Sequence, residues 1–457
     1  MRFTVLIINL FLLTSVFGQT SQNIDLLAHW YEDSIICNSS LARFSDCYGF
    51  NYKNEEYAVI GSTEGTHIFQ LTTDNQLMPK GFIKGRFSDQ SVHHRDYMHY
   101  QNYLYAVSDE GVASLQIIDF QYLPDSVYVI KEDTVNFGRV HTLFIDTLNA
   151  RLYSCTHRST VNTQTIASPM KVFSLADPLN LVEIWSGPDD IPEVHDCYVT
   201  NNKAYLNCGY DGLRVYDFSV LPPLYTESIS IYQDQGYNHQ GWLTPDGKTY
   251  LFADETNGKR VKKCNVNGNL VQIDRLFGEN WENGSIPHNM MCDNEFAYVA
   301  YYNEGFFIYD LRYEVPQKVA FYDTYPQENP FQMNGNWGVW SDLPSGRILA
   351  SDRQNGLFVF GFNKELFKQQ YPFIENPEMF PSVISEGQSV TISFPIESEE
   401  QTIEIYDLSG RLVYSELLTD YDYSLIETTF KSGLYYVHCN YIFNNKAESK
   451  VLSLTIY

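Results

Sequence analysis

Positive charge is scarce in this chain of 457 residues. Lysine and arginine number 30 against 56 aspartates and glutamates, which gives a formal net charge of −26 at pH 7. A field of this sign repels polyphosphate backbones, so nucleic acid and anionic membrane surfaces are poor partners. Charged residues are 19% of the chain and hydrophobic residues 44%, which excludes disorder throughout.

Motifs of common chemistries are missing as well. The sequence contains no CxxC pair, GxSxG elbow, P-loop, HExxH motif or EF-hand loop. Zinc knuckles, thioredoxin-like sites and these hydrolase and nucleotide-binding templates are therefore excluded. Eight cysteines are scattered along the chain. Cys37 and Cys47 are close enough for a local disulfide, and burial as free thiols is expected for most of the others.

The N-terminus has the pattern of a targeting segment. Arg2 is followed by a mostly apolar run over residues 3–17 and by small residues at 15–18. This predicts a secretory signal peptide over residues 1–18, with an N-terminal anchor helix as the alternative. No later apolar run is long enough to cross a membrane. We expect a secreted or outer-surface protein with no transmembrane segment in the mature chain.

Aromatic residues are abundant, and they belong to a repeat. Tyr (35) and Phe (29) dominate the 15% of aromatics, which favours β-structure. A turn with Gly after Asn, Asp or Glu, followed by an alternating strand, recurs at 64–69, 110–119, 211–217, 304–310 and 355–360, with a weaker copy at 257–261. Another strand precedes each turn, as in Tyr57–Ile60. Seven copies are present.

Each copy also carries a polar marker upstream. The markers are Asp46, His94, His141, His195, His239 and His288, with Trp337 in the last copy. From Asp46 to His288 the intervals are 48, 47, 54, 44 and 49 residues. A period near 48 with several strands per unit is typical of a four-stranded propeller blade. The third copy departs from the pattern, because a polar insertion at 158–168 is expected to form a long surface loop.

The ends of the repeat region predict how the ring closes. The last copy lacks a fourth strand, whereas residues 24–30 look like a fourth strand without the preceding three. We therefore expect an all-β protein: a seven-bladed β-propeller over residues 19–370, closed by the N-terminal strand. A Pro-rich linker over 371–385 leads to a small C-terminal β-sandwich over 386–457.

Two resemblances extend this interpretation. Residues 405–413, 431–437 and 450–452 resemble the type A C-terminal sorting domain of the type IX secretion system of Bacteroidota. That resemblance implies export by the type IX machinery and removal of the tag afterwards. Residues 56–66, 238–244 and 212–217 resemble LVIVD-repeat, or choice-of-anchor B, proteins, which are secreted propellers. This second resemblance implies fold and export but no agreed activity.

Propeller geometry places the histidines at one mouth of the central channel. The loop that enters each inner strand should bring His94, His141, His195, His239 and His288 together, with turn acids Asp109, Glu110, Asp211, Glu255 and Glu304 farther out. Such imidazoles could ligate a transition metal ion. A role inside the blades, repairing backbone turns, is the structural alternative. Further candidates for ligand binding are Arg95, Asp196, which could orient the ring of His195, and Trp242 and Trp337, which could stack on a ligand.

Three functions are consistent with this sequence. The first is a secreted or cell-surface binding protein for an extracellular glycan, peptide or protein. The second is a metal-dependent hydrolase, lyase or oxidase that uses the histidines, and the third is a structural or adhesion component. The sequence specifies neither the ligand nor any certain cofactor.

Overall fold

The computed structural model describes residues 21–161, 164–279, 282, 284–327, 333–370, 376–395, 398–418, 423–443 and 446–457. The predicted signal peptide, residues 1–18, lies outside this part of the chain. The described residues divide into two compact units: those up to residue 310 with 318–362, and those of 311–317 with 363–457. Both consist of β-strands, so the all-β prediction is confirmed. No helix among the described residues is long and apolar enough to cross a membrane.

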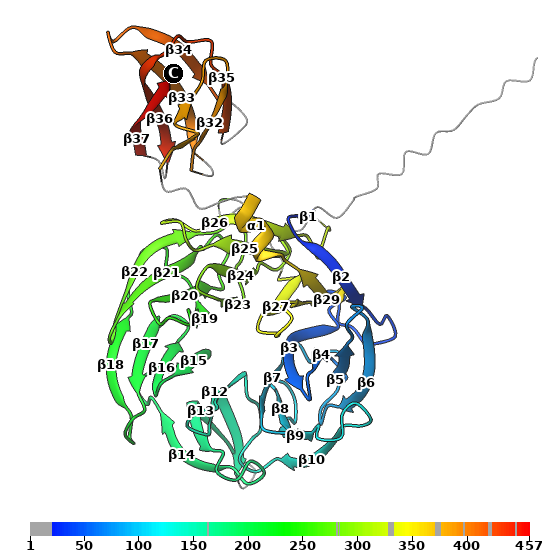
Figure 1. The fold of residues 1–457 in the computed structure, drawn as a ribbon. Helices are drawn as coiled ribbons and strands as arrows, with labels where there is room; N and C mark the ends of the chain where they lie inside the picture. Colours follow the sequence, from blue (N-terminus) through cyan, green and yellow to red (C-terminus); the bar gives the residue numbers. More distant parts are fainter. Residues whose placement is uncertain are drawn as a thin grey trace, which may run out of the picture. The chain divides into compact units, whose positions relative to one another are not determined.

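Seven antiparallel sheets make up the described part of the first unit, and they follow one another around a central space (Figure 1). In the first five, four strands pair in chain order. Their strands are β3 (Phe44–Tyr52), β4 (Glu55–Ser62), β5 (Gly65–Leu71) and β6 (Leu77–Lys84); β7 (Arg95–Tyr100), β8 (Tyr103–Ser108), β9 (Leu115–Asp119) and β10 (Tyr128–Asp133); β11 (Thr142–Asp146), β12 (Arg151–Val161), β13 (Gln164–Ser174) and β14 (Val182–Gly187); β15 (Asp196–Thr200), β16 (Lys203–Asn207), β17 (Leu213–Asp217) and β18 (Leu224–Ile229); β19 (Asn238–Leu243), β20 (Thr249–Asp254), β21 (Val261–Asn267) and β22 (Leu270–Phe277).

N-terminal strands complete the last two sheets. The sixth sheet contains β23 (Met290–Cys292), β24 (Phe296–Ala300), β25 (Phe306–Asp310) and β26 (Gln317–Tyr322), with β1 (Ser21–Gln22) added outside β26. The seventh contains β27 (Asn336–Trp340), β28 (Ile348–Asp352) and β29 (Gly356–Gly361). Its fourth strand is β2 (Asp25–Trp30), which pairs antiparallel with β29. This is the pairing of the two ends that the sequence predicts.

The inner strands contact one another in cyclic order. Those in successive contact are β3, β7, β11, β15, β19, β23 and β27, and β27 contacts β3 again. Hydrophobic cores lie between neighbouring sheets rather than inside one sheet: Tyr57 and Leu104, for example, belong to one buried cluster although they lie in different sheets. A fully buried tyrosine recurs on the second strand of the first six sheets, at Tyr57, Tyr105, Tyr153, Tyr205, Tyr250 and Tyr298.

A close backbone approach explains the glycine of the repeat. Gly212 has a positive φ of 80°, and a Cβ there would lie 2.2 Å from the carbonyl oxygen of Ile229, at the end of the fourth strand. Gly356 has a φ of 89°, and its Cβ would lie 2.2 Å from the carbonyl oxygen of Trp30. Trp30 in β2 thus occupies the position that a fourth strand occupies in a continuous sheet.

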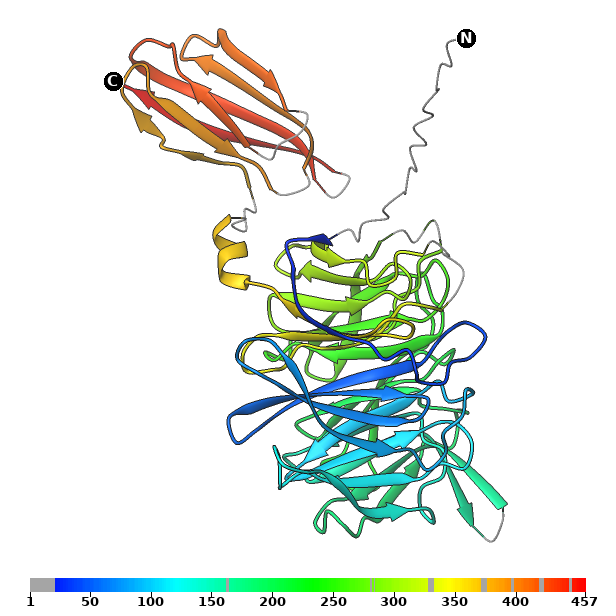
Figure 2. The same cartoon turned by 90° about the vertical axis from the view of Figure 1, so that its right-hand side faces the viewer.

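The insertion at 158–168 is not the loop that the sequence predicts. It extends the hairpin of β12 and β13, in which Arg158 pairs with Ala167 and Val161 with Gln164. The hairpin projects beyond its neighbours at the lower right of Figure 2. A strand shows alternating apolar and polar residues in the sequence only when one of its faces is buried. A hairpin of mostly polar residues lacks this alternation and resembles a loop in composition. The disulfide allowed between Cys37 and Cys47 is also not formed, since both thiols are free.

The second unit contains a helix and a two-layer sandwich. Helix α1 (Lys364–Gln370) is followed by a sheet of β30 (Glu378–Phe380), β32 (Ser389–Ser393) and β35 (Tyr423–Glu427). The other sheet has the order β31 (Val383–Ile384), β37 (Lys446–Ile456), β36 (Gly433–Phe443), β33 (Glu399–Asp407) and β34 (Leu412–Leu417). Ile403, Val437 and Leu454 belong to its buried core. This unit therefore has a hydrophobic core of its own.

Substitution of Gly356 tests the closure by β2. Gly356→Ala adds a Cβ against the carbonyl of Trp30, whereas Gly346→Ala adds one at a similar φ of 77° with nothing within 4 Å. We expect G346A to lose about 1–2 kcal/mol of stability because of the positive φ. G356A should lose about 1–3 kcal/mol more because the new atom forces the strands apart.

Urea unfolding followed by tryptophan fluorescence measures both losses. All six tryptophans precede residue 341, so the signal reports the first unit. Equal losses in the two variants would show that β2 does not press on the turn of Gly356.

Candidate functional site

Six aromatic side chains from six successive sheets form a closed ring. Ring centroids lie 4.1 Å apart for His94–His141 and for His141–His195, 4.3 Å for His195–His239 and 4.2 Å for His239–His288. Trp337 closes the ring at 4.3 Å from His288 and 5.8 Å from His94. The structure therefore brings together all five predicted histidines and one predicted tryptophan.

The inner strands position these side chains. His94, His141, His195 and His288 stand just before β7, β11, β15 and β23, while His239 and Trp337 lie within β19 and β27. The backbone N–H of His195 donates to the carbonyl of Asn207 at 2.7 Å, and that of His288 donates to Ala300 at 2.8 Å. These bonds extend the strand ladders by one residue at His195 and by two at His288, and they fix each Cα at the entrance of its strand.

Hydrogen bonds orient three of the imidazoles. Nδ1 of His195 donates to the carbonyl oxygen of His239 at 3.1 Å, and Nδ1 of His288 donates to that of Trp337 at 2.6 Å. Nδ1 of His141 contacts Oδ2 of Asp109 at 3.0 Å. A carbonyl or carboxylate oxygen accepts, so Nδ1 carries the proton in each case. In the neutral ring this leaves Nε2 with a free lone pair.

Other ring nitrogens are buried without a hydrogen-bond partner among the described residues. They are Nδ1 of His94, Nδ1 of His239, Nε2 of His288 and Nε1 of Trp337. The backbone of His288 lies beside the His239 ring without making a hydrogen bond of normal geometry. Each unsatisfied buried polar group lowers the stability of the folded state by about 1–3 kcal/mol, and four such groups lie around this one ring.

The sequence suggests that the turn acids stand farther out than the histidines. In the structure, acidic side chains lie against the ring instead. Oε2 of Glu255 is 3.7 Å from Nε2 of His239, and its Oε1 is 3.7 Å from Nε2 of His288. The Tyr302 hydroxyl donates to the same carboxylate. Asp109 bonds to His141 and also to Nη1 of Arg158 at 3.2 Å. Glu110 accepts the N–H of His94 at 3.3 Å.

Burial sets the protonation of most of the ring. It lowers the pKa of His94, His195, His239 and His288 well below the usual value, and the neighbouring imidazoles lower it further. Burial alone would also lower the pKa of His141, but the carboxylate of Asp109 raises it above the usual value. Four of the five imidazoles are therefore neutral near pH 7.

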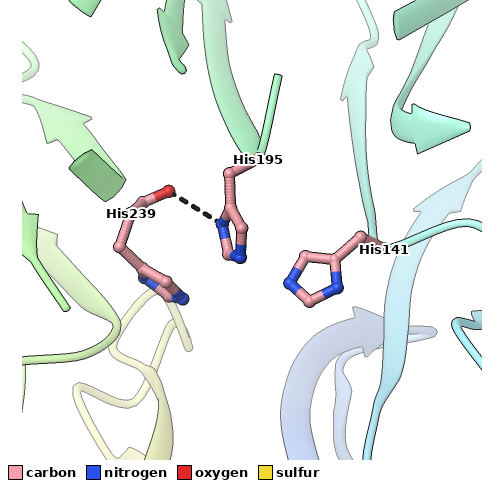
Figure 3. Close-up of side chains that lie close together, drawn as sticks. All are labelled: His141, His195 and His239. Atoms are coloured by element: carbon pink, nitrogen blue, oxygen red, sulfur yellow. Dashed lines mark hydrogen bonds between the residues drawn. The ribbon is translucent and has the colours of Figure 1, made fainter. Parts of the chain in front are cut away.

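Two groups of ring residues have the spacing of metal ligands. One nitrogen from each of His141, His195 and His239 lies within 4.8 Å of the others, and Figure 3 shows these three rings around a common space. His239, Glu255 and His288 form a second group within the same limit. His94 contacts His141 in the ring but belongs to neither group.

Three predicted residues lie away from the ring. Arg95 is buried and donates to the carbonyl oxygens of Ser62 at 2.7 Å and Phe87 at 2.8 Å, which is a structural role. Asp196 does not orient His195, because its Oδ1 accepts the N–H of Cys197. Trp242 lines a small cavity of about 50 Å³ together with Asp196 and Trp340.

That cavity contains a layer of buried acids. Asp46, Asp96 and Asp196 line it with Gln240 and Asn289, and Asn289 donates to Asp46 at 3.0 Å. Burial raises the pKa of Asp46 and Asp196 well above the usual value, and the charge of Asp96 raises both further. Burial also raises the pKa of Asp96, to about 7. Asp196 directly follows His195, so neighbouring residues on one strand supply the two layers.

Sequence reasoning missed Tyr302 at this site. It also missed that Asp109 and Glu255 contact the histidines directly. Asp109 and Glu255 were expected at the turns, but their distance from the histidines depends on how neighbouring sheets pack. Tyr302 follows β24 (Phe296–Ala300) and is fully buried, with its hydroxyl on Glu255. The pair Tyr301-Tyr302 before Asn303-Glu304 is the signal that could have drawn attention to it.

Comparison with known proteins identifies the C-terminal module. Residues 386–452 match the family described as secretion system C-terminal sorting domain. The chain thus carries a type IX sorting domain, interacts with the type IX machinery through it and is a secreted or cell-surface protein. No curated protein matches the chain.

Several solved structures are similar at low identity. A computationally designed protein, Ika8, has a TM-score of 0.44 at 10% identity and covers 72% of this chain and 99% of its own. A putative 6-phosphogluconolactonase from Bacteroides uniformis has a TM-score of 0.48 at 14% identity, covering 84% and 100%. PorZ, a surface component of the type IX secretion system of Porphyromonas gingivalis, has a TM-score of 0.44 at 11% identity. This match covers 90% of the present chain and 59% of PorZ.

Asp96→Asn tests the electrostatics of the acidic layer. The raised pKa means that folded Asp96 keeps a proton that the unfolded chain loses above pH 4, so stability falls as pH rises from about 4 to about 7. Asparagine removes the charge and still accepts the N–H of Leu143, which Asp96 binds at 2.5 Å. We expect D96N to be more stable than the natural protein at pH 8, by on the order of 2 kcal/mol.

Urea unfolding at several pH values, followed by tryptophan fluorescence, measures this difference. The gain should shrink toward zero near pH 4. Asp125→Asn, at an exposed position, changes the net charge equally and serves as the control. A gain of the same size at pH 4.5 and pH 8 would mean that ionisation of Asp96 is not its cause.

Proposed function

We propose that residues 19–370 form a seven-bladed β-propeller of the LVIVD-repeat, or choice-of-anchor B, type, which the C-terminal domain carries to the outside of the cell. The cyclic contacts from β3 to β27 and the pairing of β2 with β29 support this architecture. Each four-stranded sheet then corresponds to one blade. Residues 1–18 act as the signal peptide for the first export step, and residues 386–457 as the tag for the second.

The passenger binds an extracellular ligand at the ring of His94, His141, His195, His239, His288 and Trp337. The observation that carries this proposal is the group of four buried ring nitrogens without hydrogen-bond partners among the described residues. Proteins rarely leave such groups unsatisfied, and their concentration at one place is typical of a site that a ligand completes. The ligand classes that suit a secreted propeller are a glycan, a peptide or a protein.

Deletion of residues 386–457 tests the export step. The truncated protein keeps its signal peptide and its complete first unit, so we expect it to fold and to accumulate in the periplasm. Cell fractionation and immunoblotting should find the natural protein in the medium or on the surface and the truncated protein in neither.

A transplanted tag provides the matching control. Residues 376–457 fused to a periplasmic reporter should move that reporter outside. Export of the truncated chain, or retention of the fusion, would contradict the role of the C-terminal domain.

Trp337→Ala tests the binding site. Glycan and peptide arrays incubated with the mature protein should retain it on some probes, and W337A should bind those probes at least about tenfold more weakly because it removes the indole of the ring. Trp242→Ala is the control, since Trp242 lines the acidic cavity rather than the ring. Equal binding by W337A and the natural protein would contradict a site at the ring.

A further inference from the structure

We propose that His141, His195 and His239 bind one divalent first-row transition metal ion at the ring. This inference rests on the proposed function, because it names the chemical class of one ligand for the same site. It also changes how an extracellular partner would bind there, since a bound ion offers a coordination position in addition to the protein surface.

The distances suit such an ion after a small adjustment. Three ligand nitrogens of His141, His195 and His239 lie within 4.8 Å of one another. Zn²⁺ holds imidazole nitrogens at about 2.0–2.1 Å with tetrahedral angles, which places two of its ligands about 3.3 Å apart. Rotations of the three side chains that shorten these separations by at most about 1.5 Å are enough to enclose the ion.

The hydrogen bonds hold two imidazoles in the tautomer that a metal requires. Nδ1 of His195 donates to the carbonyl of His239, and Nδ1 of His141 to Asp109. In their neutral form both rings therefore keep Nε2 for coordination. Metal-binding histidines are characteristically anchored in this way, through the other nitrogen, to a carbonyl or a carboxylate. In Figure 3 the unbonded nitrogen of His195 lies between the other two rings.

The electrostatic surroundings favour a cation between these rings. Neutral imidazoles that present nitrogen lone pairs to a common space attract a positive ion. The carboxyl groups of Asp109 and Glu255 lie against the ring, with oxygens 3.0 Å from Nδ1 of His141 and 3.7 Å from Nε2 of His239. The net charge of −26 for the whole chain adds a long-range attraction for cations.

The three histidines are a better site than the overlapping group of His239, Glu255 and His288. In that second group, Glu255 already accepts a hydrogen bond from the hydroxyl of Tyr302, and its two oxygens each lie 3.7 Å from Nε2 of an imidazole. Because His239 belongs to both groups, only one group can hold an ion at a time. Three protein ligands leave a fourth position for water or for a donor atom of an extracellular partner.

Metal titration of the intact mature protein tests the proposal. After treatment with a chelator, the protein is titrated with Zn²⁺ by calorimetry and with Co²⁺ by visible absorption, and bound metal is counted by elemental analysis. We expect one ion per chain and the absorption of tetrahedral Co²⁺. His141→Ala and His195→Ala should each weaken Zn²⁺ binding by about 100-fold or more, and D109N by about 10-fold through loss of the anchoring carboxylate.

His99→Ala is the matched control, because His99 lies outside the ring and outside both ligand groups, with its Nδ1 2.7 Å from the hydroxyl of Tyr48. It should leave Zn²⁺ affinity within about threefold, and circular dichroism of all variants checks that they fold. Failure of the natural protein to bind Zn²⁺ or Co²⁺ would overturn the proposal, as would unchanged affinity in H195A. Loss of binding in His288→Ala but not in H141A would also overturn it, since the ion would then use the other group.

These outcomes are separate from those of the array experiment. Ring-dependent probe binding by a protein that holds no metal would leave the proposed function in place and remove the metal. If the protein binds stoichiometric Zn²⁺ but W337A binds the array probes as well as the natural protein does, the metal site stands and the proposed ligand site at the ring is contradicted.

Discussion

Contact between neighbouring inner strands is the constraint on which the rest of this structure depends. Residues that are 44–54 positions apart in the sequence, such as His195 and His239, have ring centroids 4.1–4.3 Å apart because each inner strand packs beside the next. The cycle closes through β27 and β3. Each of five sheets contributes a single histidine, and the packing of their inner strands gathers these histidines into one cluster.

The alternation of side chains along a strand divides this cluster into two chemically different layers. His195 belongs to the imidazole ring, and Asp196, the next residue, lines the cavity with Asp46 and Asp96. Burial lowers the pKa of His195 and raises that of Asp196, so both residues are driven toward their uncharged forms. A bound cation would reverse this tendency locally, because it replaces protons as the partner of the lone pairs.

The sequence predicts the larger features of this arrangement and misses the ones that depend on where single side chains point and on how neighbouring sheets pack. Turn glycines and strand periodicity were enough for the all-β class and for the convergence of the five histidines. Asp196 was placed beside the His195 ring, yet successive residues of a strand point to opposite sides and it lies in the other layer. Arg95 was counted as a ligand candidate, but its guanidinium bonds to backbone carbonyls inside the fold, a role invisible without coordinates. The contact of Glu255 with two imidazoles depends on sheet packing, which no local pattern encodes.

The N-terminal strand and the C-terminal sorting domain differ in what they contribute to the ring. Trp30 and Leu357 are paired at the seam of the first unit, so the N-terminal strand is part of the structure that holds the ring closed. The sorting domain, in contrast, buries Ile403, Val437 and Leu454 in a core of its own. Loss of that domain removes none of the strands that carry the ring. Removal of β2 would uncover β29 and take Leu27, Ala28 and Trp30 away from the hydrophobic cluster that joins the last sheet to the first, so the N-terminal strand, unlike the sorting domain, supports the contact between sheets on which the ring depends.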